Sequence, residues 1–412
     1  MATQGDEESR EGGLIRRSAV DPFDSDAEKR YEAFREMRAQ APIHEVPGER
    51  LLFVSRKMVD AGLKAVDSFS GSSGNLGDAP EEDTVMPAIP EPRHGKIRIL
   101  FNSALAYHHA SQIEPFVRRY AEDCLAESLA RVARDGEVEI METFARRIPC
   151  AVIAQVLGIP NDRIDDFAHW SDEILRLQGQ DEGSTEPIAN LLPEFTEYLE
   201  EQIRQRVDSD DPPDDMITRL LQAEVDGERL SERAVLTQTM LLIIAGNETT
   251  RNLIGNVIRR LAEDPVRYLR VQEDRSLVAI FIEESLRIDS PVQILARTCS
   301  EDVELDGVRI KKGERVIHSL GSANRDESLY PDADQFRLDR PKPRDHLGFG
   351  AGPHICPGAF LARMETRVAV ETLLDAIAAM ALAPDYVWDP NPVFWALGPR
   401  TLRLNLTPIA AP

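Results

Sequence analysis

Cys356 stands in a segment whose residue types could present a reactive thiolate. Residues 349–358 read Phe-Gly-Ala-Gly-Pro-His-Ile-Cys-Pro-Gly, so three glycines and two prolines surround one cysteine. Glycine allows backbone angles and close approaches that other residues forbid, and proline stiffens the chain. The amide groups that remain can point at the sulfur and hold it as a thiolate. A thiolate presented in this way is how some proteins bind haem iron from one face.

An isolated cysteine is more often a small packed hydrophobic residue, and a cluster of Gly and Pro is more often a simple turn. Packing gives no reason, however, for three glycines and a histidine at these offsets. The segment resembles the haem-binding signature of the cytochrome P450 family, Phe-Gly-x-Gly-x-His-x-Cys-x-Gly. The matching positions are Phe349, Gly350, Gly352, His354, Cys356 and Gly358. The resemblance implies that Cys356 ligates the iron of haem b (iron protoporphyrin IX) and that the residues around it contact the cofactor.

A second group of residues with chemical potential lies in a long predicted helix between Ser231 and Asp264. Residues 241–250, Leu-Leu-Ile-Ile-Ala-Gly-Asn-Glu-Thr-Thr, place a glycine, an acid and two hydroxyls among apolar residues. We expect Ala245, Gly246 and Thr249 to share one face, because residues three and four apart are neighbours on a helix. Thr249 can bond back to a carbonyl one turn earlier, which would open a groove for water or a diatomic ligand. In the alternative interpretation the backbone merely satisfies the threonine, and the acid is solvated.

This helix resembles the family's oxygen-activation motif, Ala-Gly-x-Asp/Glu-Thr. The match falls at Ala245, Gly246, Glu248 and Thr249. The resemblance implies that Glu248 and Thr249 help to deliver protons during oxygen activation, and that Ala245 lies against the cofactor. Such a relay needs a proton path that does not flood an apolar site with water.

Haem carries two propionates, so its site needs fixed cations. His94 and Arg98 are four residues apart on a helix predicted to start near Pro92, and they therefore share a face. They resemble the family's His-x-x-x-Arg, and Arg297 and His354 match its other propionate-binding positions. Arg is well suited to bidentate recognition of a carboxylate. Any one of the four alone would more often be a surface or packing residue.

Glu284 and Arg287 match the family's Glu-x-x-Arg motif at i and i+3 of one predicted helix. If exposed, such a pair would add little stability. In the family the pair is buried, and its third partner resembles Arg340, which follows Phe336. The resemblance implies that these residues brace the cysteine loop and take no part in the chemistry.

The positions that would contact a substrate are apolar and partly bulky, so we expect a hydrophobic small molecule: a terpenoid, steroid, fatty acid or polyketide. For any single position, an ordinary place in the core is equally expected. The expected contacts are Val85, Met86 and Ile89 in a long loop, Leu241, Leu242 and Ala245 on the central helix, Val292, Ile294 and Leu295 after the Glu-x-x-Arg helix, and Phe394, Trp395 and Leu397 in a C-terminal turn.

Length and pattern indicate the architecture that positions these residues. The chain has 412 residues, of which 42% are hydrophobic, which is enough for one large core. Helical patterns dominate, with strand-like pieces at 43–55, 303–316 and after 393. We therefore expect a fold that is mainly α with a minor β part, the P450 fold with a long central helix over the haem. We expect residues 1–25 to form a mobile acidic lead and 26–412 to form a single haem-thiolate domain.

The net charge of −24 argues against nucleic acid and anionic membrane surfaces as partners. The N-terminus has no apolar segment, and the longest strongly apolar stretch, 240–246, is too short to span a bilayer. The four cysteines form no Cys-x-x-Cys pair, so they predict neither a disulfide framework nor a zinc site, and they suit a reducing compartment. We expect a cytoplasmic protein without a membrane anchor.

The resemblance covers the chain from about residue 42 onward and implies a bacterial-type monooxygenase. It would insert one atom of O2 into its substrate by hydroxylation or epoxidation. We see no flavin or iron–sulfur module in the sequence, so a ferredoxin and its reductase would supply electrons, docking near Arg344, Arg363 and Arg367. The alternatives are a peroxide-driven enzyme and a haem-thiolate protein that oxygenates nothing. The Glu248–Thr249 pair counts against the second alternative, because a carrier needs no proton relay.

Overall fold

The structure is a computed structural model in which the chain divides into two compact units. Unit 1 consists of Met1–Asn75, Glu283–Cys356 and Pro390–Leu397, and unit 2 of Leu76–Ile282, Pro357–Asp389 and Gly398–Pro412. The structure describes residues 9–10, 13–19, 21–24, 27–48, 50–70, 79–105, 107–180, 186–391 and 395–410. Each unit draws on separate stretches of sequence. The expectation of a single domain over 26–412 therefore stays a prediction.

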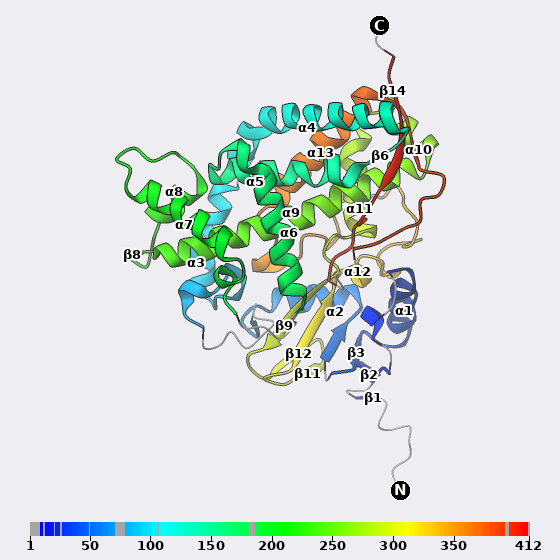
Figure 1. The fold of residues 1–412 in the computed structure, drawn as a ribbon. Coiled ribbons are helices and arrows are strands. Elements are labelled where there is room, and N and C mark those ends of the chain that lie inside the picture. Colours follow the sequence, from blue (N-terminus) through cyan, green and yellow to red (C-terminus); the bar gives the residue numbers. More distant parts are fainter. Residues whose placement is uncertain are drawn as a thin grey trace. The chain divides into compact units, whose positions relative to one another are not determined.

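Unit 1 is built on a sheet whose described strands come from distant parts of the chain (Figure 1). The strand order is β1-β2-β3-β4-β12-β9-β5. The strands are β1 Ser9–Arg10, β2 Ile15–Arg17, β3 Ile43–Val46, β4 Arg50–Phe53, β5 Phe69–Ser70, β9 Ile294–Cys299 and β12 Arg315–Ser319. β3 and β4 form the predicted hairpin, whereas β4 and β12 pair in parallel. A separate hairpin joins β10 (Val303–Leu305) to β11 (Val308–Ile310).

Two helices cover the two faces of this sheet. Successive side chains of a strand point to opposite faces, so each strand feeds two hydrophobic clusters. Phe34 of α1 (Ala27–Gln40) packs with Leu52 and Ile317 on one face. Leu63 of α2 (Arg56–Lys64) belongs to the cluster of Phe53 on the other. A short helix, α12 (Leu320–Ala323), follows β12.

Part of the segment expected to be a mobile lead is ordered in the sheet. Strand β2 pairs in parallel with β3, and Ile15 is only 3% exposed. Asp21 is buried and pairs with Arg50 of β4. The physical reason is that β3 would otherwise be an edge strand with unpaired backbone groups, which readily accept another strand. The expectation for 1–25 is therefore wrong at these residues.

Unit 2 is a helical assembly around the central helix α9 (Glu232–Ala262). Its other helices are α3 Arg93–Ala104, α4 Tyr107–Asp135, α5 Arg147–Leu157, α6 Ile164–Gln180, α7 Pro193–Val207, α8 Met216–Gln222, α10 Pro265–Glu273 and α13 Ala359–Ala376. Figure 1 shows α4 running beside α13, and these helices are in contact. The unit boundary falls inside α11 (Leu277–Ile288). No helix in the described ranges is long and apolar enough to cross a bilayer.

Two small sheets complete unit 2 among the described residues. Strand β14 (Arg403–Pro408) pairs with β13 (Ile377–Leu382) on one side and with β6 (Val138–Glu139) on the other. A short hairpin links β7 (Glu224–Val225) to β8 (Glu228–Arg229). The predicted fold, mainly α with a minor β part, is confirmed.

The ends of α9 follow from its sequence, as predicted. The Ser231 side chain caps the N-terminus by accepting a hydrogen bond from the Ala234 amide, and Pro265 opens the next helix. Inside the helix, a Cβ atom placed on Gly246 would lie 2.6 Å from Cδ1 of Ile153 on α5. The glycine thus allows α5 to approach closely. A Cβ atom on Gly246 would therefore point at α5, although the residue itself is partly exposed. Its expected place on one face with Ala245 and Thr249 stays a prediction.

Gly246→Ala should destabilise the protein because the new methyl group would have to displace Ile153. Overpacking of this kind costs about 1–3 kcal/mol. Chemical denaturation measures the loss. Ile153→Val removes the clashing Cδ1 atom, so the double variant should recover part of the stability lost by Gly246→Ala. Strictly additive losses would contradict the contact.

Candidate functional site

Cys356 ends a tight loop of unit 1. Its amide donates to the Phe349 carbonyl at 2.9 Å, which closes the loop on itself. Gly350 and Gly352 have φ angles of 74° and 68°, in the region that favours glycine. A Cβ atom on Gly352 would also lie 2.8 Å from the carbonyl oxygen of Leu63 on α2. Gly350 and Gly352 therefore serve a turn and a close backbone approach, as their types predict.

Cys356 differs from the other three cysteines in its exposure. It is exposed, whereas the others are buried, and none of the four forms a disulfide. Burial raises the pKa of Cys124 to about 11 and that of Cys150 to about 12. Burial also raises the pKa of Cys299. Such thiols stay protonated at neutral pH and are poor ligands. Cys356 is therefore the cysteine that a metal-containing group could reach.

Two buried polar contacts hold the start of this loop. Nε2 of His346 lies 2.9 Å from a carboxylate oxygen of Glu283 on α11, and the Asn324 side-chain oxygen accepts from the Leu347 amide at 2.7 Å. All three side chains are buried. The sequence analysis assigned no role to them. A signal existed for Glu283, since a second acid beside Glu284 in an apolar helix needs a partner once it is buried.

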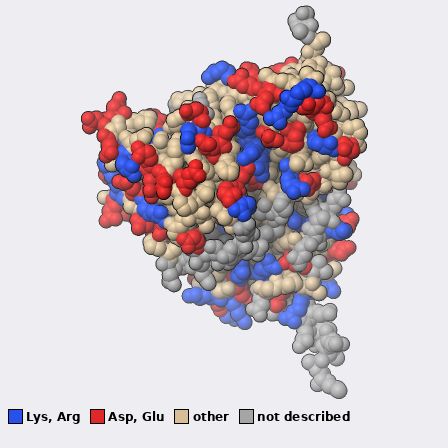
Figure 2. Space-filling model, in the orientation of Figure 1, with Lys and Arg blue, Asp and Glu red and all other residues tan. Residues whose placement is uncertain are grey.

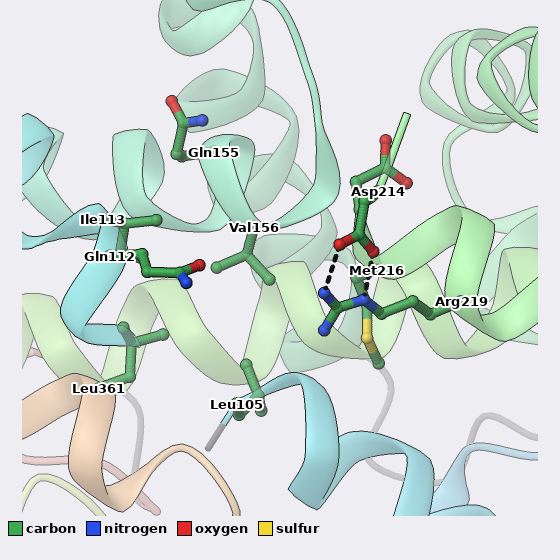
Figure 3. A pocket seen from close by; sticks show the side chains of 10 residues that line it. Leu105, Gln112, Ile113, Gln155, Val156, Asp214, Met216, Arg219 and Leu361 are labelled. Carbon is green, nitrogen blue, oxygen red and sulfur yellow. Dashed lines mark hydrogen bonds and ion pairs between the residues drawn. The ribbon is translucent and has the colours of Figure 1, made fainter. Parts of the chain in front are cut away.

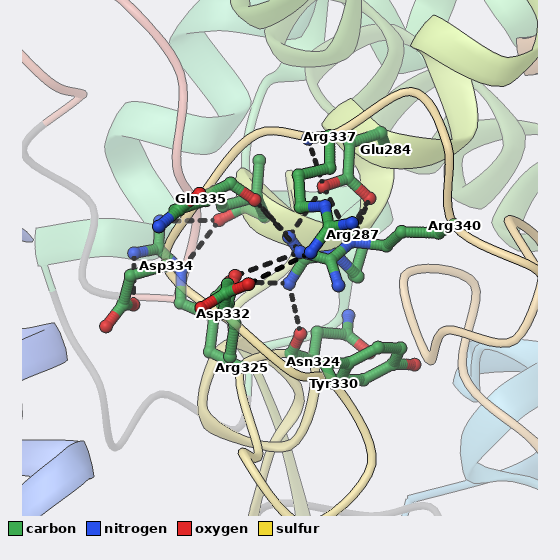
Figure 4. A network of polar contacts seen from close by, with 12 residues as sticks. Glu284, Arg287, Asn324, Arg325, Tyr330, Asp332, Asp334, Gln335, Arg337 and Arg340 are labelled. Atoms are coloured by element: carbon green, nitrogen blue, oxygen red, sulfur yellow. Dashed lines mark hydrogen bonds and ion pairs between the residues drawn. The ribbon is translucent and has the colours of Figure 1, made fainter.

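Next to these contacts lies the ion cluster predicted from the Glu-x-x-Arg motif (Figure 4). Glu284 accepts from Arg287 at 2.7 and 2.9 Å and from Arg340 at 3.0 and 3.1 Å. Arg287 also donates to the carbonyls of Asn324 and Ala333 at 2.9 and 2.8 Å. Glu284 and Arg287 are each 1% exposed. The prediction of Arg340 as the third partner is confirmed.

Arg297 on β9 has the environment of an anion-binding residue. Burial lowers the pKa of its guanidinium, which donates to the Ala296 carbonyl at 2.8 Å. No carboxylate in the described part of the chain pairs with it. A desolvated cation of this kind gains from an anion that is supplied from outside the chain. An exposed thiol and such a guanidinium, both in unit 1, fit the iron and a propionate of haem.

His318 was not predicted from the sequence, but it lies on the same face of the sheet as Arg297. In the pairing of β12 with β9, Val316 stands opposite Arg297, and His318 follows two residues later. Its ring packs edge-on against Phe53 and Phe69 and is fully buried. Burial, reinforced by the charge of Arg297, lowers the pKa of His318 to about 3. The imidazole is therefore neutral at pH 7 and adds no second positive charge.

In unit 2, His94 and Arg98 lie one turn apart on the buried face of α3, as predicted. His94 is fully buried and Arg98 is 9% exposed. The sequence analysis missed Glu91, whose carboxylate lies 2.7 Å from Nδ1 of His94 and accepts from the Gly95 amide at 3.0 Å. Glu91 thus orients the imidazole and satisfies an amide at the start of the helix. An acid placed just before a helix was the available signal.

On α9, a stripe of Leu241, Ala245 and Thr249 is incompletely buried. Ala245 is exposed and the other two are half-buried, whereas Leu242 is buried at 7% exposure. The Thr249 hydroxyl donates to the Ala245 carbonyl at 2.8 Å, which confirms the predicted back-bond. Of the substrate contacts expected on this helix, Leu241 and Ala245 lie on the open stripe, and Leu242 belongs to the core.

The described part of the long loop runs along the first half of α9. It carries two short 3-10 helices, η4 (Glu81–Asp83) and η5 (Met86–Ala88). The Gln238 carboxamide accepts from the Met86 amide at 2.9 Å and donates to the Thr84 carbonyl at 2.8 Å. Val85 is half-buried and Met86 is buried. The structure thus places this expected pair of contacts beside α9. The sequence analysis assigned no role to Gln238. A glutamine within an apolar run nevertheless indicates a buried amide that needs hydrogen-bond partners.

In unit 1 the expected substrate contacts divide between the two faces of the sheet. Val292 and Leu295 are half-buried on the α2 face. Ile294 and Trp395 pack instead in the core cluster against α1. The alternation of side chains along a strand separates Ile294 from its neighbour Leu295. The expected substrate contacts of Ile294 and Trp395 stay predictions. Phe394 lies outside the described residues.

Glu248 is buried, at 2% exposure, between two neighbours on its own helix. One carboxylate oxygen lies 2.5 Å from Arg251, and the other accepts from the Asn252 amide group at 3.0 Å. The alternative in which this acid is merely solvated is therefore wrong.

A cavity of about 170 Å³ lies elsewhere in unit 2 (Figure 3). Arg219 at its wall donates to the Asp214 carboxylate at 2.8 and 3.0 Å. Its lining residues are Leu105, Gln112, Ile113, Gln155, Val156, Asp214, Asp215, Met216, Arg219 and Leu361. None of the predicted site residues lines this cavity, so it is not the expected substrate pocket.

Comparisons with known proteins agree with this arrangement. The sequence profile described as Cytochrome P450 matches residues 68–377. "Cytochrome P450 109" of Bacillus spizizenii is 36% identical over 324 residues, which are 77% of this chain and 78% of that protein. The structure of CYP109Q5 from Chondromyces apiculatus matches with a TM-score of 0.83 at 31% identity. The match covers 97% of this chain and 100% of the CYP109Q5 chain. CYP109E1 from Bacillus megaterium, in complex with testosterone, has a TM-score of 0.79 at 32% identity, over 91% and 98% of the two chains.

Glu284→Gln should lower the free energy of unfolding by about 3–5 kcal/mol, because two buried guanidiniums would lose their shared carboxylate. Urea denaturation measures the change. The control is Asp339→Asn, which removes an exposed partner of Arg337 and should leave the midpoint almost unmoved. Equal effects of the two substitutions would show that the buried cluster does not stabilise the fold.

Proposed function

Because the chain belongs to the cytochrome P450 family of monooxygenases, we propose that it inserts one atom of O2 into a hydrophobic small molecule, with haem b held by the Cys356 thiolate. The observation that carries this proposal is the state of Cys356. It is exposed at the end of a loop that buried polar contacts hold, while the other three cysteines are buried. A fixed, reachable thiolate is what haem iron requires from a protein.

The cations of the site would hold the propionates. We assign this role to Arg297 and His354 in unit 1 and to His94 and Arg98 in unit 2. The desolvated guanidinium of Arg297 supports the assignment most directly, because a carboxylate would compensate its charge. Phe349, Gly350 and Gly358 would contact the haem through the loop. When bound, haem supplies the oxygen-activating chemistry.

The chain's own part in that chemistry is to move protons and exclude water. The Thr249 hydroxyl donates its hydrogen to the Ala245 carbonyl, which leaves its oxygen free to accept one. Glu248, the residue before it, would be the buried acid that exchanges protons with it. We therefore assign proton delivery to Glu248 and Thr249, with Ala245 beside the haem.

The substrate would lie against apolar side chains that the core does not fully cover. In unit 2 these are Val85, Leu241 and Ala245, and in unit 1 they are Val292 and Leu295. Their chemistry supports a largely apolar ligand, because all five side chains are apolar. The testosterone complex of CYP109E1, at 32% identity, supports a steroid-sized molecule.

A ferredoxin-type protein would supply the electrons. Of the residues expected to dock this protein, Arg367 pairs with Glu114 at 2.6 Å and with Glu371 at 3.0 Å, which offsets its charge. Arg344 contacts Glu283 at 3.3 Å and has 74% of its side chain exposed, so it remains available to an acidic partner. In Figure 2, Lys and Arg are interspersed with Asp and Glu over the face shown. Four cysteines that form no disulfide support a cytoplasmic location.

Cys356→Ser should abolish thiolate ligation. The measurement is the difference spectrum of the dithionite-reduced holoprotein with and without carbon monoxide, in which the strongly red-shifted Soret band should disappear. Cys299→Ala is the matched control and should keep that band. A Cys356→Ser protein with the native spectrum would remove Cys356 as the ligand.

Thr249→Ala should divert reducing equivalents from product to peroxide. Loss of a proton-transfer group costs about a hundredfold or more in the step it serves, so product formed per NAD(P)H should fall steeply. Thr249→Ser keeps the hydroxyl and should retain most of the coupling. Unchanged coupling in Thr249→Ala would exclude the relay. Full activity of the wild type with peroxide alone, with no response to NAD(P)H and redox partners, would favour a peroxide-driven enzyme.

A further inference from the structure

His346 of unit 1 lies between an acid of helix α11 and the backbone of the cysteine loop. Its Nε2 atom lies 2.9 Å from Oε2 of Glu283. On the other side of the ring, the Gly348 amide donates to Nδ1 at 3.0 Å. The imidazole and the carboxylate are both buried, with 1% and 4% of their side chains exposed. A buried ring thus connects a carboxylate to a backbone amide of the loop.

These two contacts determine which ring nitrogen carries the proton. A neutral imidazole has one N–H group and one lone pair. Because the Gly348 amide donates to Nδ1, the lone pair is on Nδ1 and the proton is on Nε2. Nε2 then donates to Glu283, whose other oxygen lies 3.3 Å from Nε of Arg344. Both carboxylate oxygens of Glu283 therefore face a donor, and the acid needs no proton of its own.

The backbone at Gly348 runs directly against α11 and the imidazole. Gly348 is buried, and a Cβ atom on it would lie 2.9 Å from the Leu286 carbonyl oxygen and 3.0 Å from Nδ1 of His346. A buried amide that loses its acceptor is costly, because water does not replace the lost hydrogen bond. The lone pair on Nδ1 therefore contributes to holding this part of the loop in place.

From Gly348 the backbone contacts continue to Cys356. The Leu347 carbonyl accepts from the Gly350 amide at 2.8 Å, and the Phe349 carbonyl accepts from the Cys356 amide at 2.9 Å. Gly348 lies between the two residues whose carbonyls accept, so the direction of its peptide groups decides where both carbonyls point. The imidazole of His346 thus acts on the loop that presents the thiol.

We propose that Glu283 is a positioning residue for Cys356, and that it acts by fixing the proton of His346 on Nε2. Nδ1 is then always available to accept from the Gly348 amide. A carboxylate suits this task because it only accepts hydrogen bonds, whereas a side-chain amide can also donate to Nε2 and move the ring proton to Nδ1. Two N–H groups would then face each other, and the loop would lose this contact. The inference rests on the proposed thiolate ligation by Cys356.

Glu283→Gln tests the position of the ring proton, because glutamine donates as well as accepts. Nitrogen NMR of isotope-labelled histidine in the diamagnetic ferrous carbonyl holoprotein distinguishes the protonated ring nitrogen from the other. The signal that His346→Asn removes identifies this ring. The wild type should carry the proton on Nε2, and Glu283→Gln should show a substantial population with the proton on Nδ1. A wild-type ring protonated on Nδ1, or a ring that stays protonated on Nε2 alone in Glu283→Gln, would overturn the proposal.

Two substitutions of His346 separate the two sides of the ring. Asparagine places an oxygen near the position of Nδ1 and can accept from Gly348, whereas glutamine reaches the position of Nε2 and keeps the contact with Glu283. At a fixed urea concentration below the unfolding transition, the red-shifted Soret band of the carbonyl complex should decay faster in His346→Gln than in His346→Asn. The expected ratio of the two rates is about fivefold, the effect of one hydrogen bond. Equal rates, or slower decay in His346→Gln, would contradict the role of Nδ1.

His44→Asn is the control for a general loss of stability. His44 is also buried in unit 1, and its Nε2 atom lies 2.9 Å from the Met37 carbonyl oxygen. This substitution should lower the urea midpoints of the helical circular dichroism and of the Soret band together. In Glu283→Gln the band should be lost at a lower urea concentration than the helical signal. Coincident transitions in Glu283→Gln would show that Glu283 only stabilises the fold and does not position the thiolate.

The spectrum of the wild type tells the two levels of inference apart. If the wild type lacks the red-shifted Soret band, Cys356 is not the ligand, and the positioning role fails together with the proposed function. If the wild type shows the band while Glu283→Gln keeps both the proton on Nε2 and the wild-type urea dependence of the band, thiolate ligation stands. In that case only the positioning role of Glu283 is wrong.

Discussion

A carboxylate buried beside two guanidiniums cannot rely on water, so Glu284, Arg287 and Arg340 depend on one another for their charge balance. Removing ions of this kind from water costs several kcal/mol each, which only close pairing and further hydrogen bonds offset. Those further bonds come from backbone carbonyls, such as that of Asn324. The Asn324 side chain in turn bonds the Leu347 amide at the start of the cysteine loop. The position of the loop thus depends on a cluster that does no chemistry.

In unit 2, buried neutral polar groups likewise depend on close hydrogen-bond partners. The central helix is largely apolar, but two polar side chains within it bond particular neighbouring segments. Gln238 bonds the backbone of the long loop, and Asn247 bonds α5 and α6. Buried polar groups without partners are costly, so these bonds admit few alternative packings. The apolar residues supply the driving force for packing, and the polar ones decide which segments lie along the helix.

The parts that the sequence predicts are those with fixed local spacing. The cysteine loop, the Glu284–Arg287 pair and both ends of α9 depend on residues only a few positions apart. The roles of Glu283, His318 and Gln238 depend on partners far along the chain, which no local pattern reveals. Strand β13 was missed because its sequence, Ile-Ala-Ala-Met-Ala-Leu, also suits a helix and follows α13 directly. Strand alternation alone places Ile294 and Leu295 on opposite faces of the sheet, which the sequence analysis did not use.

The division of unit 1 into separate stretches has a consequence for how the chain is made. Among the described strands, the parallel partner of β4 is β12, where Arg50 pairs with Arg315. Most of unit 2 lies between these two strands in sequence. During synthesis the apolar segment Arg50–Phe53 therefore emerges from the ribosome long before one side of its sheet exists. Pairings of such long range form late, and unpaired apolar strands aggregate in the meantime. The nascent chain would then need either a chaperone or the β3–β4 hairpin packed on α1 to protect that segment until translation has passed residue 319.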